Sequence, residues 1–165
     1  MKEAHVKIAE MLLAQLEREV PATRKAIERV PAGKNEWKPH PKSMALGYLS
    51  VLIAMMPSWI EMMIEREYLD LGTGGGPPSG NLLEIFDRSV EAARRALSST
   101  NDQHLMKPWQ LRVNGKVVDE KPRYIMITDT FSHLAHHRGQ LTVYLRLNEI
   151  AVPSIYGPTA DEGWG

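Results

Sequence analysis

The sequence predicts an all-α fold, an antiparallel four-helix bundle with a small β-hairpin between its third and fourth helices. Four long segments place apolar residues at three- and four-residue spacing, which is the pattern of an amphipathic helix. One short segment instead alternates apolar and polar residues on both sides of Asn114-Gly115, a dipeptide typical of tight hairpin turns. The sequence shows no internal repeat, and we expect residues 1–165 to form a single domain.

The first half of the chain is expected to hold two helices. The first spans residues 3–29, and Pro21 should bend it or mark a local break. A proline-rich connection follows, after which Ser43 is a candidate N-cap for a second helix that runs to about Tyr68. Pro57 should kink this second helix near its middle.

The second half is expected to hold the hairpin between two further helices. Asn81 can cap the third helix, because its side chain accepts hydrogen bonds from free backbone N–H groups of the first turn. The hairpin at Asn114-Gly115 should be a small two-stranded excursion and not the centre of a larger sheet. Pro122 opens the fourth and longest helix, which ends near Glu149.

Charge and cysteine content exclude several functions. Lysine plus arginine total 20 and aspartate plus glutamate total 20, so the chain lacks the strong positive field of a nucleic-acid binder. Near-neutral chains repel each other little, so self-association is not opposed. The chain has no cysteine, which excludes disulfides, thiolate metal ligands and a thiol nucleophile, and which fits a cytoplasmic protein.

A membrane span is the other interpretation of residues 44–60, which carry no charge. Their length is near the lower limit for a span. They also contain glycine, serine and proline, and the charged stretch "EMMIERE" follows at once. We therefore interpret them as a buried helix of the bundle, and we expect neither a membrane nor a nucleic acid as partner.

The stretch "FSHLAHHRGQLTVYLR", residues 131–146, holds three of the six histidines. At 100° per residue, His133 and His137 share one edge of the buried face, whereas His136 points to solvent. Two imidazoles four residues apart can bind one metal ion, but a useful site needs a third protein ligand. The alternative is a hydrogen-bonded, half-buried histidine pair without a metal.

Arg138 falls within the buried stripe of the same helix, where a charge must be paired. Its partner is expected to be an acid from another helix, an acid of the tail (Asp161 or Glu162), or an acid of a second subunit. In the remaining alternative its stem packs inside and its guanidinium reaches solvent.

Four segments in this order resemble the DinB-like family: "WKPHPKSMALG", "MPSW", "HLAHHRGQLTVYLR" and "VPSIYGPTADE". The resemblance covers nearly the whole chain, and the family takes its name from a damage-inducible bacterial gene. It implies an up-down-down-up four-helix bundle, a homodimer, and a divalent metal such as zinc or nickel held by three histidines. Two of these ligands match His133 and His137, and the third precedes "MPSW" in the second helix. Some relatives are thiol-dependent transferases or isomerases.

The sequence departs from the family pattern at the third ligand, where it has Leu52. No histidine lies between His40 and His104, and an aliphatic side chain has no lone pair to donate. A ferritin-like di-iron site is also disfavoured, because no Glu-x-x-His motif is present. The candidate replacements for the third ligand are few: Met55, Met56, Glu61, His5 and His40.

Two functions follow from this incomplete site. In the first, the chain is a metal-poor, non-catalytic member that binds a small apolar or amphipathic molecule in the vacant pocket, or that acts only through dimerisation. In the second, it is a divalent-metal-dependent enzyme of the thiol-dependent transferase or hydrolase type, whose ion lowers the pKa of a thiol or water. Its catalytic residues are unknown, and any zinc or nickel is expected to be weakly bound or absent.

The second helix has more apolar residues than one buried face requires. Some of this surface should meet a second subunit, as in a homodimer. Alternatively, the hairpin or the tail, with Ile155, Tyr156 and Trp164, covers it. The apolar residues concerned are Met55, Met56, Trp59, Met62 and Met63.

Overall fold

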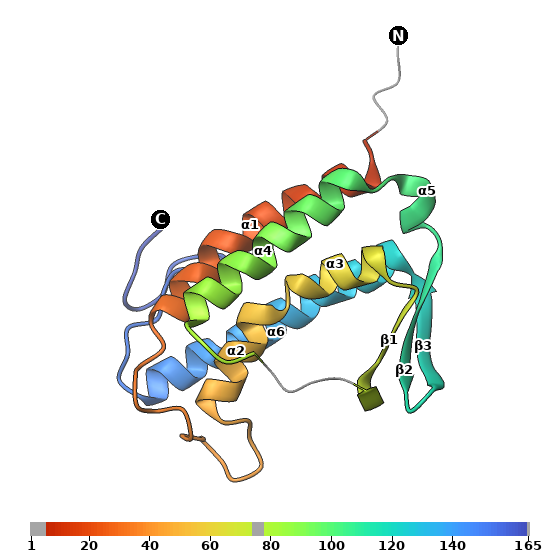
Figure 1. The fold of residues 1–165 in the computed structure, drawn as a ribbon. Coiled ribbons are helices and arrows are strands. Elements are labelled where there is room, and N and C mark those ends of the chain that lie inside the picture. Colours follow the sequence, from red (N-terminus) through yellow and green to blue (C-terminus); the bar gives the residue numbers. More distant parts are fainter. Residues whose placement is uncertain (1–5, 74–77, 165) are drawn as a thin grey trace.

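A computed structural model describes residues 6–73 and 78–164. Most of this part is helical, as predicted, and a small sheet accompanies the helices (Figure 1). The candidate ligand His5 lies outside the described residues. The helices are α1 (Ile8–Glu28), α2 (Leu46–Met55), α3 (Ser58–Glu65), α4 (Leu82–Ser99), α5 (Asp102–Leu105) and α6 (Arg123–Leu147). The other elements are β1 (Tyr68–Asp70), the 3₁₀ turn η1 (Leu71–Thr73), β2 (Pro108–Val113) and β3 (Lys116–Pro122).

Pro21 lies inside α1, and the helix continues through it to Glu28. The sequence predicted either a bend or a local break at Pro21, and the break does not occur. Pro21 is exposed, so its ring and its missing N–H group do not disturb the buried face of the helix. That face carries Leu12 and Leu16 into the core.

The predicted second helix consists of two helices, because the chain bends at Pro57. The axes of α2 and α3 differ by 48°. Ser58 Oγ donates a hydrogen bond of 2.7 Å to the Met55 carbonyl, which helps to satisfy an acceptor at the bend. The predicted limits were wrong at both ends: the residue before α2 is Ala45 and not Ser43, and helical structure ends at Glu65 because the chain then becomes extended.

The predicted starts of two helices in the second half of the chain, α4 and α6, agree with the structure, the second to within one residue. The Asn81 side chain accepts hydrogen bonds from the backbone N–H groups of Leu83 (2.9 Å) and Glu84 (3.3 Å), which makes it the N-cap of α4. Pro122 is the residue immediately before α6. At this position a backbone N–H would have no partner within the helix, so its absence in proline costs no helical hydrogen bond.

The sheet has three strands in the order β1-β2-β3, and not the two that the sequence predicted. Asn114 and Gly115 have positive φ angles of 50° and 78°, so they form the predicted tight turn between antiparallel β2 and β3. The third strand, β1, pairs in parallel with β2, with Tyr68 opposite Gln110. A strand of three residues is too short to show alternation in the sequence, which explains the error.

The helices enclose a core in two parts. In Figure 1, α1 and α4 lie side by side, and α6 runs along α2 and α3. One cluster of buried residues lies toward the sheet and includes Met63 and Trp109. The other lies between α2, α4 and the second half of α6 and includes Phe86 and Leu141. The sheet therefore covers part of the apolar surface of α3, as one of the two sequence interpretations predicted.

No single helix in the described parts of the chain has both the length and the apolar character needed to cross a membrane. Helices α2 and α3 reach that length and composition only as a pair, across their bend.

Candidate functional site

His133 and His137 lie on consecutive turns of α6, and their imidazoles meet. Their Nε2 atoms are 2.8 Å apart, and their ring centroids are 4.5 Å apart. His137 is 6% exposed, whereas His136 is exposed, as the helical spacing predicted. Among the described residues of the sequence-predicted site, these two histidines are the ones that the fold brings together directly.

Gln140 orients His137 through its amide group. The His137 Nδ1–H donates to Gln140 Oε1 at 2.8 Å, and Gln140 Nε2 donates to His136 Nε2 at 3.1 Å. With its proton on Nδ1, His137 presents the Nε2 lone pair, so His133 Nε2–H donates to it. Burial of part of the ring, followed by the nearby His137 and His136, lowers the pKa of His133 below its ordinary value, which favours the neutral form of His133.

The residues that the structure describes do not complete a three-histidine metal centre. Two nitrogen ligands of one tetrahedral zinc ion would be ~3.3 Å apart. The Nε2 atoms of His133 and His137 would therefore need to separate only slightly to bind one ion together. Within the described residues, however, no group of three histidine or carboxylate side chains is placed to share an ion. Leu52 is half-buried and packs against the second core cluster, where its side chain offers no electron pair.

The other candidate third ligands have different roles in the fold. Met56 is fully buried in the second core cluster, and Met55 packs against the same cluster. Glu61 lies 3.7 Å from Arg95 in an ion pair between α3 and α4. His40 accepts a hydrogen bond from the Lys42 backbone N–H in the proline-rich connection.

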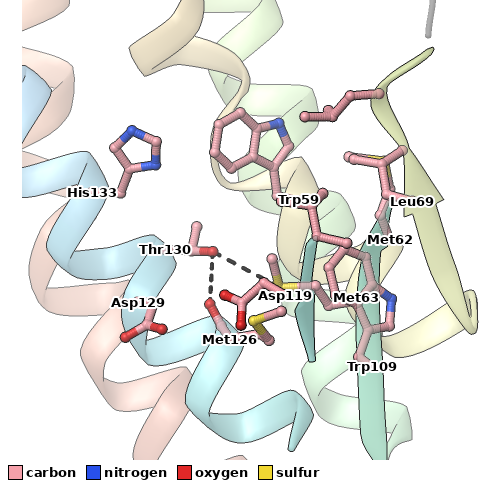
Figure 2. Close-up of a pocket in the computed structure, with 12 residues that line it drawn as sticks. Trp59, Met62, Met63, Leu69, Trp109, Asp119, Met126, Asp129, Thr130 and His133 are labelled. Atoms are coloured by element: carbon pink, nitrogen blue, oxygen red, sulfur yellow. Dashed lines mark hydrogen bonds between the residues drawn. The ribbon is translucent and has the colours of Figure 1, made fainter. Parts of the chain in front are cut away.

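A pocket of about 320 Å³ opens beside His133, between the sheet, α3 and the first half of α6 (Figure 2). The Trp59 ring lies 5.7 Å from the His133 ring, centroid to centroid, and both side chains line the pocket. The other lining residues are Met62, Met63, Leu69, Leu71, Trp109, Leu111, Asp119, Met126, Asp129 and Thr130. Most of this wall is apolar, as is usual for small-molecule sites.

Two uncharged polar groups of the pocket wall, the Thr130 hydroxyl and the Trp109 indole N–H, are hydrogen-bonded within the protein or buried in it. Thr130 Oγ1 donates to the Met126 carbonyl at 3.0 Å and lies 3.8 Å from Met63 Sδ, as the dashed lines in Figure 2 show. Trp109 is 2% exposed, and its Nε1–H has no hydrogen-bond partner in the described residues. The indole of Trp109 therefore acts mainly as an apolar surface.

Two carboxylates stand at the edge of the pocket and share one ammonium group. Asp119 comes from β3 and Asp129 from α6, and Lys121 Nζ lies 3.0 Å from Oδ2 of each. Hydrogen bonds to Asp129 and then to Asp119 raise the pKa of Lys121 above its ordinary value. Sequence reasoning missed Trp109, Asp119 and Asp129, because only the folding of the hairpin onto α3 and α6 brings them to His133.

Arg138 is paired with an acid from another helix, which was the first of its predicted alternatives. Its Nη1 lies 2.8 Å from Glu19 Oε2 of α1 and donates to Thr23 Oγ1 at 2.7 Å. The Tyr156 hydroxyl donates to Glu19 Oε2 at 2.8 Å and accepts from Arg138. Burial and Glu19 raise the pKa of Tyr156. This network joins α1, α6 and the tail, and it lies apart from the residues that line the pocket.

The tail acids serve other arginines. Asp161 pairs with Arg146 of α6, and Glu162 pairs with Arg29 at the end of α1. Neither is the partner of Arg138, so those two alternatives for its pairing were wrong.

No family model matches the chain. An uncharacterised protein of Bacillus subtilis, YrdA, is 30% identical over 81 residues, which are 49% of this chain and 46% of YrdA. The chain thus spans about half the length of this curated relative in the match.

Solved structures match over much more of the chain. A DinB-like protein from Bacillus subtilis has a TM-score of 0.69 at 15% identity, over 88% of this chain and 97% of that one. Another from Bacillus cereus has a TM-score of 0.69 at 20% identity, over 89% and 97%. The chain has the DinB-like fold. A candidate DinB member from Exiguobacterium sibiricum agrees, with a TM-score of 0.63 at 16% identity, over 92% and 98%.

At these identities the comparison of DinB-like structures establishes the fold and not a shared chemistry. The incomplete histidine site and the neighbouring pocket are therefore features to be interpreted from the residues of this chain.

Proposed function

We propose that the chain is a DinB-like protein that binds a small apolar or amphipathic molecule in the pocket beside His133. In this proposal His133 forms a polar edge of the pocket, and its pair with His137 is not a complete metal centre. The observation that carries the proposal is the apolar pocket itself, which His133 lines. His133 converges with His137, and no third histidine or carboxylate among the described residues is placed to share an ion with them.

The size and lining of the pocket indicate the kind of ligand. A volume of about 320 Å³ is at the lower end of the range for small-molecule sites, so a single ring with a short chain suits it. Methionine side chains are flexible and polarisable and adapt to ligands of different shape. The two indoles supply large apolar faces for an aromatic or alkyl group.

The same proposal includes the architecture that the family resemblance implies. The four helical units would be α1, α2 with α3, α4, and α6, in an up-down-down-up bundle that forms one domain over residues 1–165. The packing of α1 and of the α2–α3 pair against both α4 and α6 supports this arrangement. A homodimer is also proposed, and light scattering coupled to size exclusion tests it by the mass in solution.

Calorimetric titration with 4-butylbenzyl alcohol tests the binding proposal. We expect saturable binding of one molecule per chain, and we expect Met62→Gln to weaken it about tenfold, because an amide replaces an apolar contact in the pocket. Met55→Gln is the matched control, since Met55 is also half-buried but does not line the pocket. Absence of binding to the unmodified protein, or equal weakening by both variants, contradicts the proposal.

A divalent-metal-dependent enzyme is the second candidate, and one observation favours it. The Nε2 atoms of His133 and His137 converge, and Gln140 holds His137 in the tautomer that presents Nε2. Dialysed protein titrated with zinc or nickel distinguishes the candidates. Stoichiometric binding at micromolar concentration supports the metal-dependent enzyme, whereas occupancy well below one ion per chain supports the metal-poor protein.

A further inference from the structure

We propose that the pocket beside His133 selects amphipathic cations, meaning an apolar ring or chain that carries one ammonium group, over neutral or anionic molecules of the same shape. This inference rests on the proposed binding function and adds the charge of the ligand to it. It is carried by the placement of charged groups around the pocket and not by the apolar lining.

The charges at the pocket edge do not cancel. Asp119 and Asp129 both line the pocket, and the one ammonium group between them belongs to Lys121. Two carboxylates and one ammonium leave one net negative charge. In the described part of the chain, no lysine or arginine lines the pocket. An approaching anion would therefore meet repulsion that no wall residue offsets.

The carboxylates also retain capacity to accept hydrogen bonds. Lys121 contacts Oδ2 of both aspartates. Within the described residues, no donor is placed on Oδ1 of either one, so a ligand N–H group can occupy that position. Figure 2 shows Asp119 and Asp129 on the α6 side of the pocket, below His133 and Thr130.

The aromatic and methionine lining supplies the surface for the apolar part of such a ligand. Trp59 lines the pocket next to His133, and methionine sulfur adds a polarisable contact. A ligand with its apolar part among Met62, Met63 and Trp59 can thus direct its ammonium group to the aspartates.

Three probes of nearly equal shape test this preference by calorimetry at neutral pH and low salt: 4-butylbenzylammonium, 4-butylbenzyl alcohol and 4-butylbenzoate. We expect the ammonium probe to bind about fivefold more tightly than the alcohol, as a partly exposed charge pair should, and the benzoate to bind most weakly. Added salt should reduce the difference, because it screens the charges.

Variants at the pocket edge give opposite expected results. Asp129→Asn should remove most of the preference for the ammonium probe, whereas Lys121→Gln should increase it by freeing both carboxylates. Asp87→Asn is the matched control, because Asp87 is an exposed carboxylate in an ion pair with Arg24 of α1 and does not line the pocket. It makes the same change in net charge and should leave the preference unchanged.

The outcomes separate this inference from the function on which it rests. Equal affinity for the three probes, or a preference that Asp87→Asn reduces as much as Asp129→Asn does, overturns the charge selectivity and leaves the apolar pocket in place. No binding of any probe overturns the proposed function and the selectivity with it.

Discussion

His133 and His137 present their Nε2 atoms to each other at 2.8 Å on α6, and the His133 side chain lines the pocket. The two nitrogens share a hydrogen bond, and Gln140 fixes the proton of His137 on the opposite side of its ring. Gln140 thus holds His137 with its Nε2 lone pair toward His133, and the chain has Leu52 where the family resemblance places a third histidine.

Restoring a third histidine tests whether that leucine is the reason for the incomplete site. We expect Leu52→His to raise zinc affinity on the order of 100-fold, because a third nitrogen completes the protein part of a tetrahedral site. Zinc titration calorimetry measures the change. Leu83→His, at another half-buried leucine, controls for simply adding a histidine. If both variants bind zinc alike, position 52 does not face the histidine pair.

The buried ion pair between Glu19 and Arg138 should dominate the response to substitution in α1 and α6. Arg138→Met leaves a carboxylate that is almost fully buried without its cation, and we expect it to lower the free energy of unfolding by about 3–5 kcal/mol. The double variant Glu19→Leu with Arg138→Met should lose much less than the sum of the two single changes. Urea unfolding measures all three, and strict additivity would show that the pair is not coupled.

Asn81 should contribute to stability as a helix cap. Asn81→Ala removes an acceptor for the N–H groups of Leu83 and Glu84, so we expect the free energy of unfolding to fall by about 1 kcal/mol. Ser79→Ala, just outside the helix at an exposed position, is the control and should change little. Chemical denaturation gives both values, and an equal loss in the two variants would argue against a capping role.

Local signals of this kind account for the parts of the fold that the sequence predicted. The Asn81 cap, the turn at Asn114-Gly115 and the bend at Pro57 each depend on a backbone preference within a few residues. The adjacency of His133 and His137 likewise follows from helical geometry alone.

The remaining features depend on contacts between distant segments. Strand β1 is three residues long and pairs with β2 some 40 positions later, so no local pattern marks it. Glu19 could not be distinguished from other acids as the partner of Arg138, because the choice depends on how α1 packs on α6. The pocket escaped prediction for the same reason, since β3, α3 and α6 each supply only part of its wall.

The C-terminal tail should loosen as the pH falls. Asp161 accepts from Arg146 and from the Val152 N–H, and Glu162 accepts from the Ser154 N–H and from Arg29. These contacts lower the pKa of both carboxyls below their ordinary values. A lowered folded-state pKa means that the stabilisation is present above the ordinary pKa and disappears as the pH falls through the lowered one.

Hydrogen exchange at Val152 and Ser154 measures this loosening directly, because their N–H groups donate to the two carboxylates. After correction for the intrinsic exchange rate, protection should be constant near neutral pH and should decrease as the pH falls below about 4. Protection that persists unchanged into the fully acidic range would show that the charged contacts do not hold the tail.

The tryptophan indole N–H signals in a nitrogen–proton correlation spectrum test the central claim most directly, that the pocket beside His133 is a small-molecule site. Trp59 and Trp109 line the pocket, whereas Trp37 packs on Tyr144 and Trp164 is 81% exposed near the end of the chain. Titration with 4-butylbenzyl alcohol should move the signals of Trp59 and Trp109 in a saturable manner and leave those of Trp37 and Trp164 in place. Movement confined to Trp37 or Trp164, or no movement at saturating probe, would contradict the account.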